Sequence, residues 1–185
     1  LDYFCLWVNA ESPYKTAQEY LDAVKKEPGK FNMGGTGSKQ EDQIITVMFD
    51  QMFGTKFSYV PFKGGGEVAV ELVGKHVDST VNNPAEAVSH WKAGTLRPLA
   101  TIDSARIDLP DWKAIPTMKE ATGKDMSYLM LRGIFMTPGV TKDQQDFFVG
   151  VMKKVTETPE WKKYVSDMGL KDAYLDGDAY VKWLE

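Results

Sequence analysis

The sequence predicts an α/β fold, with a mostly parallel sheet covered by helices, and three features lead to this prediction. Between residues 30 and 102, short strand-like segments alternate with segments of helical periodicity. Glycine-rich turns join a strand to a helix twice in this part of the chain. The chain has 185 residues, of which 43% are hydrophobic, so it is long enough to bury a core. Such alternation is typical of parallel sheets whose right-handed crossovers are helices.

The first expected strand, Tyr3 to Val8, is apolar at almost every position. This composition is typical of a strand that is buried on both faces of a sheet. Ser12 is expected to cap a helix that begins at Pro13 and ends at the Pro28-Gly29 pair. Further strands are expected at residues 30–34, 57–62, 77–81 and 96–102, and helices at residues 41–53, 67–73 and 84–93.

The helix at residues 41–53 has an apolar stripe that predicts its core face. The stripe consists of Ile44, Val47, Met48 and Met52, widened by Ile45 and Phe49. Gly54 is placed to end this helix. Glu41 and Asp42 are expected to be solvated in its first turn.

The C-terminal part is expected to hold one strand and then helices only. The strand is the dense apolar run at residues 128–136, and a capping box of Thr141 with Gln144 begins the first helix. Two more helices are expected, one from Pro159 and one at residues 178–184. These helices have no strand of their own, so we expect them to pack on a sheet outside this sequence. The chain also starts inside a strand without a polar lead-in, which predicts that it belongs to something longer.

The main candidate binding site is the turn Gly35-Thr36-Gly37-Ser38, between a strand and the helix at residues 41–53. Glycines let backbone N–H groups converge, and the first turn of a helix adds unpaired donors and the positive end of its dipole. Such a turn suits a carboxylate or a phosphate, with Lys39 and Gln40 next to it. The alternative is an ordinary turn in which Ser38 caps the helix.

Two nucleotide-binding motifs do not fit this turn. A P-loop ends in Gly-Lys-Ser/Thr, whereas here Lys39 follows Ser38. A dinucleotide fingerprint that starts at Gly35 requires glycine where the chain has Gln40. These mismatches favour a carboxylate as the anion.

Two other strand ends are also candidates. Asn82 and Asn83 follow the strand at residues 77–81, and open α/β sheets bind ligands beyond the carboxyl ends of their strands. Asn83 precedes Pro84, so it also has the identity of a helix N-cap. The run Phe62-Lys63-Gly64, with two further glycines, indicates either a close approach to a ligand or a flexible connection.

Composition and spacing argue against several other classes. The net charge of −4 and the absence of a basic stripe argue against a nucleic-acid surface. Cys5, the only cysteine, lies in an apolar strand, so packing is favoured over pairing with His76 or His90. No metal-ligand spacing or cofactor motif is present, so we expect neither a metal nor a cofactor.

Several motifs together resemble the periplasmic solute-binding proteins of tripartite tricarboxylate transporters. The resemblance covers nearly the whole chain, and its Pro-Phe-Lys-Gly-Gly-Gly and Gly-x-x-Val-Asp elements are specific in this order and spacing. The matching motifs are Ser12-Pro13-Tyr14-Lys15-Thr16, Pro28-Gly29-Lys30, Gly35-Thr36-Gly37-Ser38, Val60-Pro61-Phe62-Lys63-Gly64-Gly65-Gly66, Gly74-Lys75-His76-Val77-Asp78, Ala93-Gly94-Thr95-Leu96-Arg97-Pro98-Leu99-Ala100 and Ile115-Pro116-Thr117.

The resemblance implies a two-lobed clamshell of the type II periplasmic-binding kind. Residues 1–11 and 126–136 would be strands that cross between the lobes, and residues 12–125 would be the complete second lobe. Residues 137–185 would be helices that return to the first lobe. On this view Arg132, like Phe62, Lys63 and Gly64, is expected near the cleft or hinge.

The resemblance also implies a function. Family members hold a small organic carboxylate between their lobes and deliver it to integral-membrane transporter subunits, which implies a periplasmic, monomeric and non-catalytic protein. The matching ligand positions are Gly35, Thr36, Gly37 and Ser38, with Lys39, Gln40, Asn82 and Asn83 beside them. Many members have a histidine shortly after the Gly-Ser pair, where this chain has Gln40-Glu41-Asp42. The choice among di-, tricarboxylic and aromatic acids therefore stays open.

Two other functions remain open at this stage. The same clamshell architecture can serve as the ligand-sensing effector domain of a regulator, which an upstream helix-turn-helix segment would favour. The other possibility is an enzyme that acts on an anionic substrate through Ser38 or Lys39, although no partner acid or base can be named for Ser38.

Overall fold

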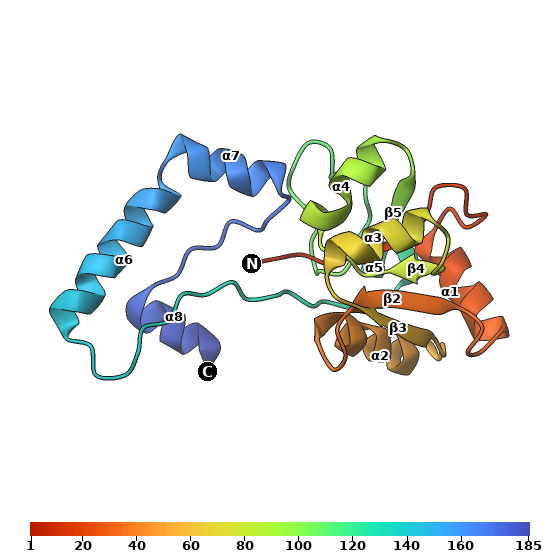
Figure 1. The fold of residues 1–185 in the computed structure, drawn as a ribbon, viewed down its shortest axis with the longest axis horizontal. Helices are drawn as coiled ribbons and strands as arrows, with labels where there is room; N and C mark the ends of the chain where they lie inside the picture. The colour runs from red at the N-terminus through yellow and green to blue at the C-terminus, as the bar shows by residue number, and fades with distance from the viewer.

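The structure is a computed structural model that describes residues 1–185. Its centre is a five-stranded sheet with the strand order β3-β2-β4-β1-β5 (Figure 1). Strand β2 is parallel to both of its neighbours, β3 and β4, whereas β1 runs antiparallel to both β4 and β5. The strands are β1 (Cys5–Asn9), β2 (Asn32–Thr36), β3 (Ser58–Phe62), β4 (Ser79–Thr80) and β5 (Leu96–Thr101).

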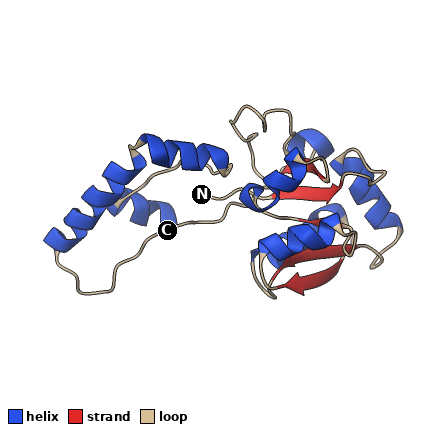
Figure 2. Cartoon of the chain, turned by 45° about the horizontal axis from the view of Figure 1, so that its top comes forward, coloured by secondary structure: helices blue, strands red, loops and turns tan.

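Helices cover both faces of the sheet (Figure 2), which confirms the predicted α/β class. One buried cluster joins the sheet to α1 (Ala17–Lys26), α2 (Glu41–Phe53) and α5 (Met118–Thr122). A second cluster joins the opposite face to α3 (Gly65–Val73) and α4 (Pro84–Lys92). The sheet is therefore the middle layer of three.

Strand β1 and the residues before it are buried on both faces, as the sequence predicts. Phe4 and Leu6 belong to the cluster under α1 and α2, whereas Cys5 and Trp7 belong to the cluster under α3 and α4. This alternation follows from the period of two along a strand, since successive side chains point to opposite faces. Cys5 is fully buried and free, which fits its expected packing role.

The structure corrects the expected start of α1 and the expected core face of α2. Helix α1 begins at Ala17 and not at Pro13, because Thr16 and Glu19 form a complete capping box there. In α2 the buried apolar residues are Ile45, Phe49 and Phe53. Ile44 and Val47, which belong to the predicted stripe, are 45% and 46% exposed, because the sheet meets the neighbouring face of the helix.

Residues 128–136 do not form the expected strand. Their only ladder contact is one antiparallel bridge, between Met130 and Asp2, and the side chains of Ile134 and Phe135 are 73% and 67% exposed. A strand needs a neighbour to satisfy its backbone groups, and here only Tyr128, which donates to the Ile102 carbonyl, and Met130, which pairs with Asp2, have backbone partners.

Three helices lie apart from the sheet, on the left of Figure 1. They are α6 (Lys142–Thr156), α7 (Pro159–Asp167) and α8 (Gly177–Leu184). The predicted capping box of Thr141 with Gln144 is present, and α7 begins at Pro159 as expected, with Thr158 as its N-cap. No helix of the chain combines the length and the apolar composition needed to cross a membrane. The exposed apolar side chains of α6, α7 and α8 include Phe147, Phe148, Val151, Val155, Tyr164, Val181, Trp183 and Leu184.

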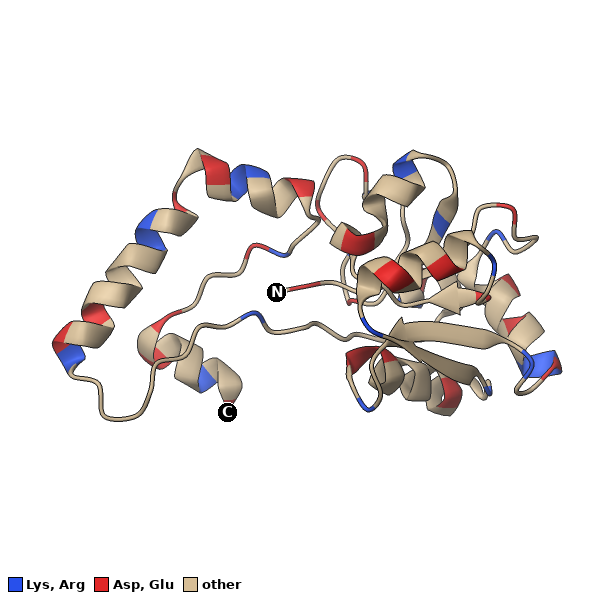
Figure 3. Ribbon diagram, viewed as in Figure 1, with Lys and Arg blue, Asp and Glu red and all other residues tan.

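Charged residues of both signs are interspersed over the helices (Figure 3). Most ion pairs join exposed side chains, such as Lys142 with Asp146 on α6 and Lys163 with Asp167 on α7. Exposed pairs of this kind contribute little to stability because water and salt screen them. Burial of the two apolar clusters is therefore the main source of stability of the sheet and its helices.

Candidate functional site

Three strand-to-helix turns meet at one edge of the sheet. Strand β2 lies between β3 and β4, and the three strands run in the same direction, so the turns after them share an edge. The N–H of Gly37, in the turn after β2, donates to the carbonyl of Phe62 at the end of β3 over 2.8 Å. This edge is a topological switch point, where open α/β sheets bind ligands.

The turn after β2 is held by Asp42 and Tyr59. A carboxylate oxygen of Asp42 accepts from the Thr36 N–H at 2.6 Å. The Tyr59 hydroxyl, on β3, lies 2.9 Å from the Gly37 carbonyl and 3.2 Å from the Thr36 carbonyl, and its single proton is shared between them. These contacts fix three successive peptide groups of the candidate site, those that join residues 35 to 38.

Gly35 makes room for both of these side chains. A Cβ atom at this position would lie 2.5 Å from the Tyr59 hydroxyl oxygen and 2.6 Å from the Asp42 Cβ. Real Cβ atoms do not approach other heavy atoms so closely. Glycine at position 35 is therefore required for Asp42 and Tyr59 to reach the turn.

The fixed peptide groups leave particular N–H donors unpaired. The carbonyl of one residue and the N–H of the next point in opposite directions across a planar trans peptide. Since Tyr59 binds the Gly37 carbonyl, the Ser38 N–H points away from Tyr59. The N–H groups of Ser38 and Gln40 have no hydrogen-bond partner in the chain, and the first turn of α2 adds its own unpaired donors. The turn can therefore donate several hydrogen bonds to one anion.

The side chains of residues 38–40 lie at the surface. Ser38 does not cap α2, because the N-cap is Gln40, and the Ser38 hydroxyl is 3.4 Å from the Gln43 amide oxygen. That amide oxygen also accepts from the Lys39 N–H at 2.6 Å. Lys39 has a positive φ of 61°, a conformation that non-glycine residues adopt rarely. The partner of Ser38 is thus an amide, which cannot act as a general base.

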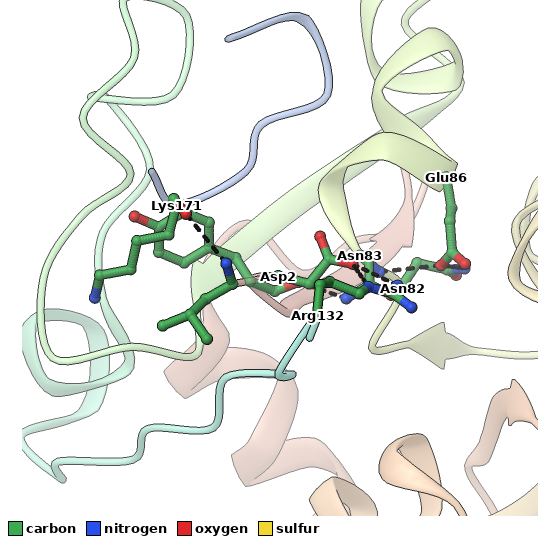
Figure 4. Close-up of polar contacts among 8 residues, drawn as sticks. Asp2, Asn82, Asn83, Glu86, Arg132 and Lys171 are labelled. Atoms are coloured by element: carbon green, nitrogen blue, oxygen red, sulfur yellow. Dashed lines mark hydrogen bonds and ion pairs between the residues drawn. The ribbon is translucent and has the colours of Figure 1, made fainter. Parts of the chain in front are cut away.

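Asn82 and Asn83 are buried, and their amide nitrogens bind within the chain, whereas the buried Asn82 amide oxygen has no hydrogen-bond partner (Figure 4). The Asn82 amide nitrogen donates to the Gly65 carbonyl at 2.8 Å and to the Glu86 carboxylate at 2.9 Å. The Asn83 amide nitrogen donates to the Tyr3 carbonyl at 2.7 Å, and its backbone N–H donates to Glu86 at 3.1 Å. Asn82 therefore joins α3 to α4, and Asn83, which is also the predicted N-cap of α4, joins α4 to the residues before β1.

Glu86 is an acidic residue of this edge that the sequence did not single out. Its carboxylate fills the space where Gly65 would carry a Cβ, since that atom would lie 2.0 Å from the Glu86 carboxyl group. The carboxylate thus occupies the backbone N–H of Asn83 at the start of α4 and shields the start of α3. The turn after β2 is consequently the more open donor set of the edge.

Asp42 was expected to be solvated, but it is 7% exposed. Burial raises the pKa of its carboxyl group to about 6, and the hydrogen bond from Thr36 only partly offsets this. Burial also raises the pKa of the Tyr59 hydroxyl, and the nearby Asp42 charge adds to that effect. No sequence pattern shows this burial; the only available signal is Gly35, which leaves space for a neighbouring side chain.

The remaining predicted residues lie at two places. Lys63 is exposed and Phe62 and Gly64 are half-buried beside the turn, where β3 ends. Arg132 lies elsewhere, on the segment that pairs with Asp2, and its guanidinium donates to the Asp2 carboxylate through Nε at 2.9 Å and Nη2 at 2.5 Å (Figure 4). Within residues 1–185, no group of His, Cys, Asp and Glu side chains could hold a metal ion.

The Tyr59 contact gives a testable prediction. Changing Tyr59 to Phe removes the hydroxyl that orients the Gly37 and Thr36 carbonyls, so we expect the free energy of unfolding to fall by about 1 kcal/mol. We also expect the Ser38 and Gln40 amide resonances to move in ¹⁵N-correlated NMR spectra.

Tyr14→Phe is the matched control, since the Tyr14 hydroxyl donates no hydrogen bond in the chain. Unchanged amide resonances in Tyr59→Phe would contradict the orienting role of the hydroxyl.

Comparisons with known proteins place this geometry in context. A family model described as the tripartite tricarboxylate transporter family receptor matches residues 2–185. A curated relative from Cupriavidus necator, described as the UPF0065 protein in gbd 5'region, is 28% identical over 180 residues. The match covers 97% of this chain and 54% of the relative. The chain thus spans about half the length of that relative.

Two solved structures share the fold. A TctC solute binding protein from Polaromonas has a TM-score of 0.78 at 24% identity, over 98% of this chain and 62% of that one. MatC from Rhodopseudomonas palustris, with bound malate, has a TM-score of 0.77 at 17% identity, over 91% and 56% of the two chains. At these identities the likeness supports the type II binding-protein fold.

Proposed function

Since the chain belongs to the tripartite tricarboxylate transporter receptor family, we propose that it forms part of a periplasmic protein that captures a small organic carboxylate for a membrane transporter. The observation that carries the proposal is the set of unpaired N–H donors at Ser38, Gln40 and the first turn of α2. The malate bound by MatC belongs to the same chemical class, a small dicarboxylate.

Charge around the turn supports an anionic ligand. The exposed ammonium groups of Lys39 and Lys63 flank the turn, and neither forms an ion pair within the chain. A carboxylate bound at the backbone donors would gain charge-assisted hydrogen bonds, which are stronger than those between neutral groups. The buried Asn82 and Asn83 act in this proposal as positioning residues that hold the neighbouring turns in place.

We further propose that residues 12–125 form one ligand-binding lobe and that residues 1–11 and 126–136 cross to another. The antiparallel direction of β1 and the paired backbone groups of Asp2 and Met130 support two adjacent crossing segments. Residues 137–185 would pack on the other lobe through the exposed apolar faces of α6 to α8. Closure of the two lobes would then exclude water from the carboxylate.

The function is tested by adding malate, adipate or citrate as a probe and monitoring the chain by ¹⁵N-correlated NMR. We expect at least one probe to shift the Ser38 and Gln40 amide resonances at millimolar concentration. Ser38→Leu should weaken that binding by about tenfold or more, because the larger side chain covers the donors.

Ser89→Leu is the control, since Ser89 is an exposed serine on α4, away from the turn. Thermal unfolding of both variants without a probe checks that each is folded. Equal affinity in the wild type and Ser38→Leu would remove this turn from the proposed site.

A further inference from the structure

Asp42 is a buried acid that contacts the backbone just before the turn of the proposed carboxylate site. Its side chain turns back from the first turn of α2 and accepts from the Thr36 N–H at 2.6 Å. The unpaired Ser38 N–H belongs to the same short turn, two residues further along. A ligand on that donor would therefore bring negative charge close to the Asp42 carboxylate.

The groups around Asp42 do not neutralise it. Glu86 on α4 and Glu41 on α2 act on Asp42 with negative charge, and they raise its pKa together with burial. Tyr59 on β3 and Tyr128 on the segment after α5 are neutral neighbours whose own pKa values are raised by burial and, in addition, by the Asp42 charge. An additional anion would make this environment still less favourable for an ionised Asp42.

A protonated Asp42 can keep its structural contact. The oxygen that faces Thr36 can go on accepting the N–H, while the other carboxyl oxygen carries a proton taken from the solvent. The turn would thus retain its shape when Asp42 becomes neutral.

We propose that Asp42 determines the charge that the carboxylate site accepts, and that capture of an anionic ligand brings one proton onto Asp42. This inference rests on the carboxylate site of the proposed function. Asp42 acts here as a specificity-determining residue that selects on ligand charge. Binding of a ligand with fewer negative charges requires less proton uptake by Asp42.

The sign of the pH dependence follows from linkage. Bound ligand raises the pKa of Asp42 above its value of about 6 in the free protein. Affinity is therefore highest where Asp42 is already protonated, and it falls as the pH rises through the free pKa towards the bound pKa. If the ligand raises that pKa by about one unit, the affinity falls by about tenfold in total, from pH values well below the free pKa to values well above the bound pKa.

The decisive measurement is the titration of the Asp42 carboxyl carbon by ¹³C NMR, without a probe and with saturating malate, adipate or citrate. We expect the midpoint to move to higher pH when the probe is bound. We expect Asp42→Asn to bind the same probe about fivefold more tightly than the wild type at neutral pH, and equally well at acidic pH. The asparagine oxygen can still accept from Thr36, so the turn is retained.

Asp22→Asn is the matched control, because it makes the same change in net charge on α1, where Asp22 forms no hydrogen bond or ion pair. It should leave both the Asp42 midpoint and the affinity unchanged. Probe binding without a shift of the Asp42 midpoint, or with equal affinity in Asp42→Asn at neutral pH, would overturn the inference and leave the proposed function intact. No probe-induced shift at Ser38 or Gln40 would instead overturn the proposed function.

Discussion

Gly35→Ala is expected to abolish carboxylate binding and to lower the free energy of unfolding by about 2 kcal/mol. The added Cβ would lie 2.5 Å from the Tyr59 hydroxyl oxygen and 2.6 Å from the Asp42 Cβ. Relief of these two clashes requires Tyr59 or α2 to move. Either movement releases the peptide groups that fix the direction of the Ser38 N–H. The measurements are chemical denaturation and NMR titration with malate, adipate and citrate.

Gly66→Ala is the control for this substitution. Gly66 lies in α3, and a Cβ there would have no heavy atom within 4 Å. Alanine also has the higher helix propensity, so the control should be slightly more stable than the wild type. A Gly35→Ala protein that keeps both its stability and its affinity would show that the turn is not constrained as described.

Asn82→Asp is expected to destabilise the protein by about 3 kcal/mol at neutral pH, although the two side chains have nearly the same shape. The Asn82 amide nitrogen faces the Gly65 carbonyl and the Glu86 carboxylate, at 2.8 Å and 2.9 Å. A carboxylate in its place would present negative charge to two acceptors and would have no water around it.

The pH dependence of Asn82→Asp distinguishes charge from lost packing. The pKa of the new acid is expected to be raised in the folded state above its ordinary value of about 3.9. Its cost is therefore present at neutral pH, and it shrinks as the pH falls through the folded pKa towards the ordinary one.

Denaturation of the variant and the wild type at several pH values measures this difference. Gln18→Glu, an amide-to-acid change at an exposed position in the first turn of α1, should cost nothing. A loss of stability in Asn82→Asp that did not change with pH would contradict the electrostatic explanation.

Local sequence signals predicted most element boundaries. Helix α2 occupies residues 41–53 as expected and ends at Gly54, whose positive φ of 69° suits glycine. The caps at Asn83 and Thr141 and the helix start at Pro159 were also predicted, because capping depends on residues within one turn of each other.

Predictions failed where a more distant neighbour decided the outcome. The exposed side of α2 depends on where the sheet lies, so Ile44 and Val47 point to solvent despite their helical spacing. Residues 128–136 have the composition of a strand, but strand pairing requires a partner, and within the chain only Asp2 provides one.

The sequence by itself determined the α/β class, the alternation of strands and helices, and the glycine-rich connection before the helix at residues 41–53. These properties depend on periodicity, capping and glycine content, which are local. The structure shifts the predicted turn, because Gly35 and Thr36 are the last residues of β2 and the turn comprises residues 37–40. Only the tertiary structure decided which donors of that turn are unpaired, because Tyr59 and Asp42 reach it through contacts between separate elements. The buried charge of Asp42 has the same origin: desolvation depends on packing, which no pattern of neighbouring residues records.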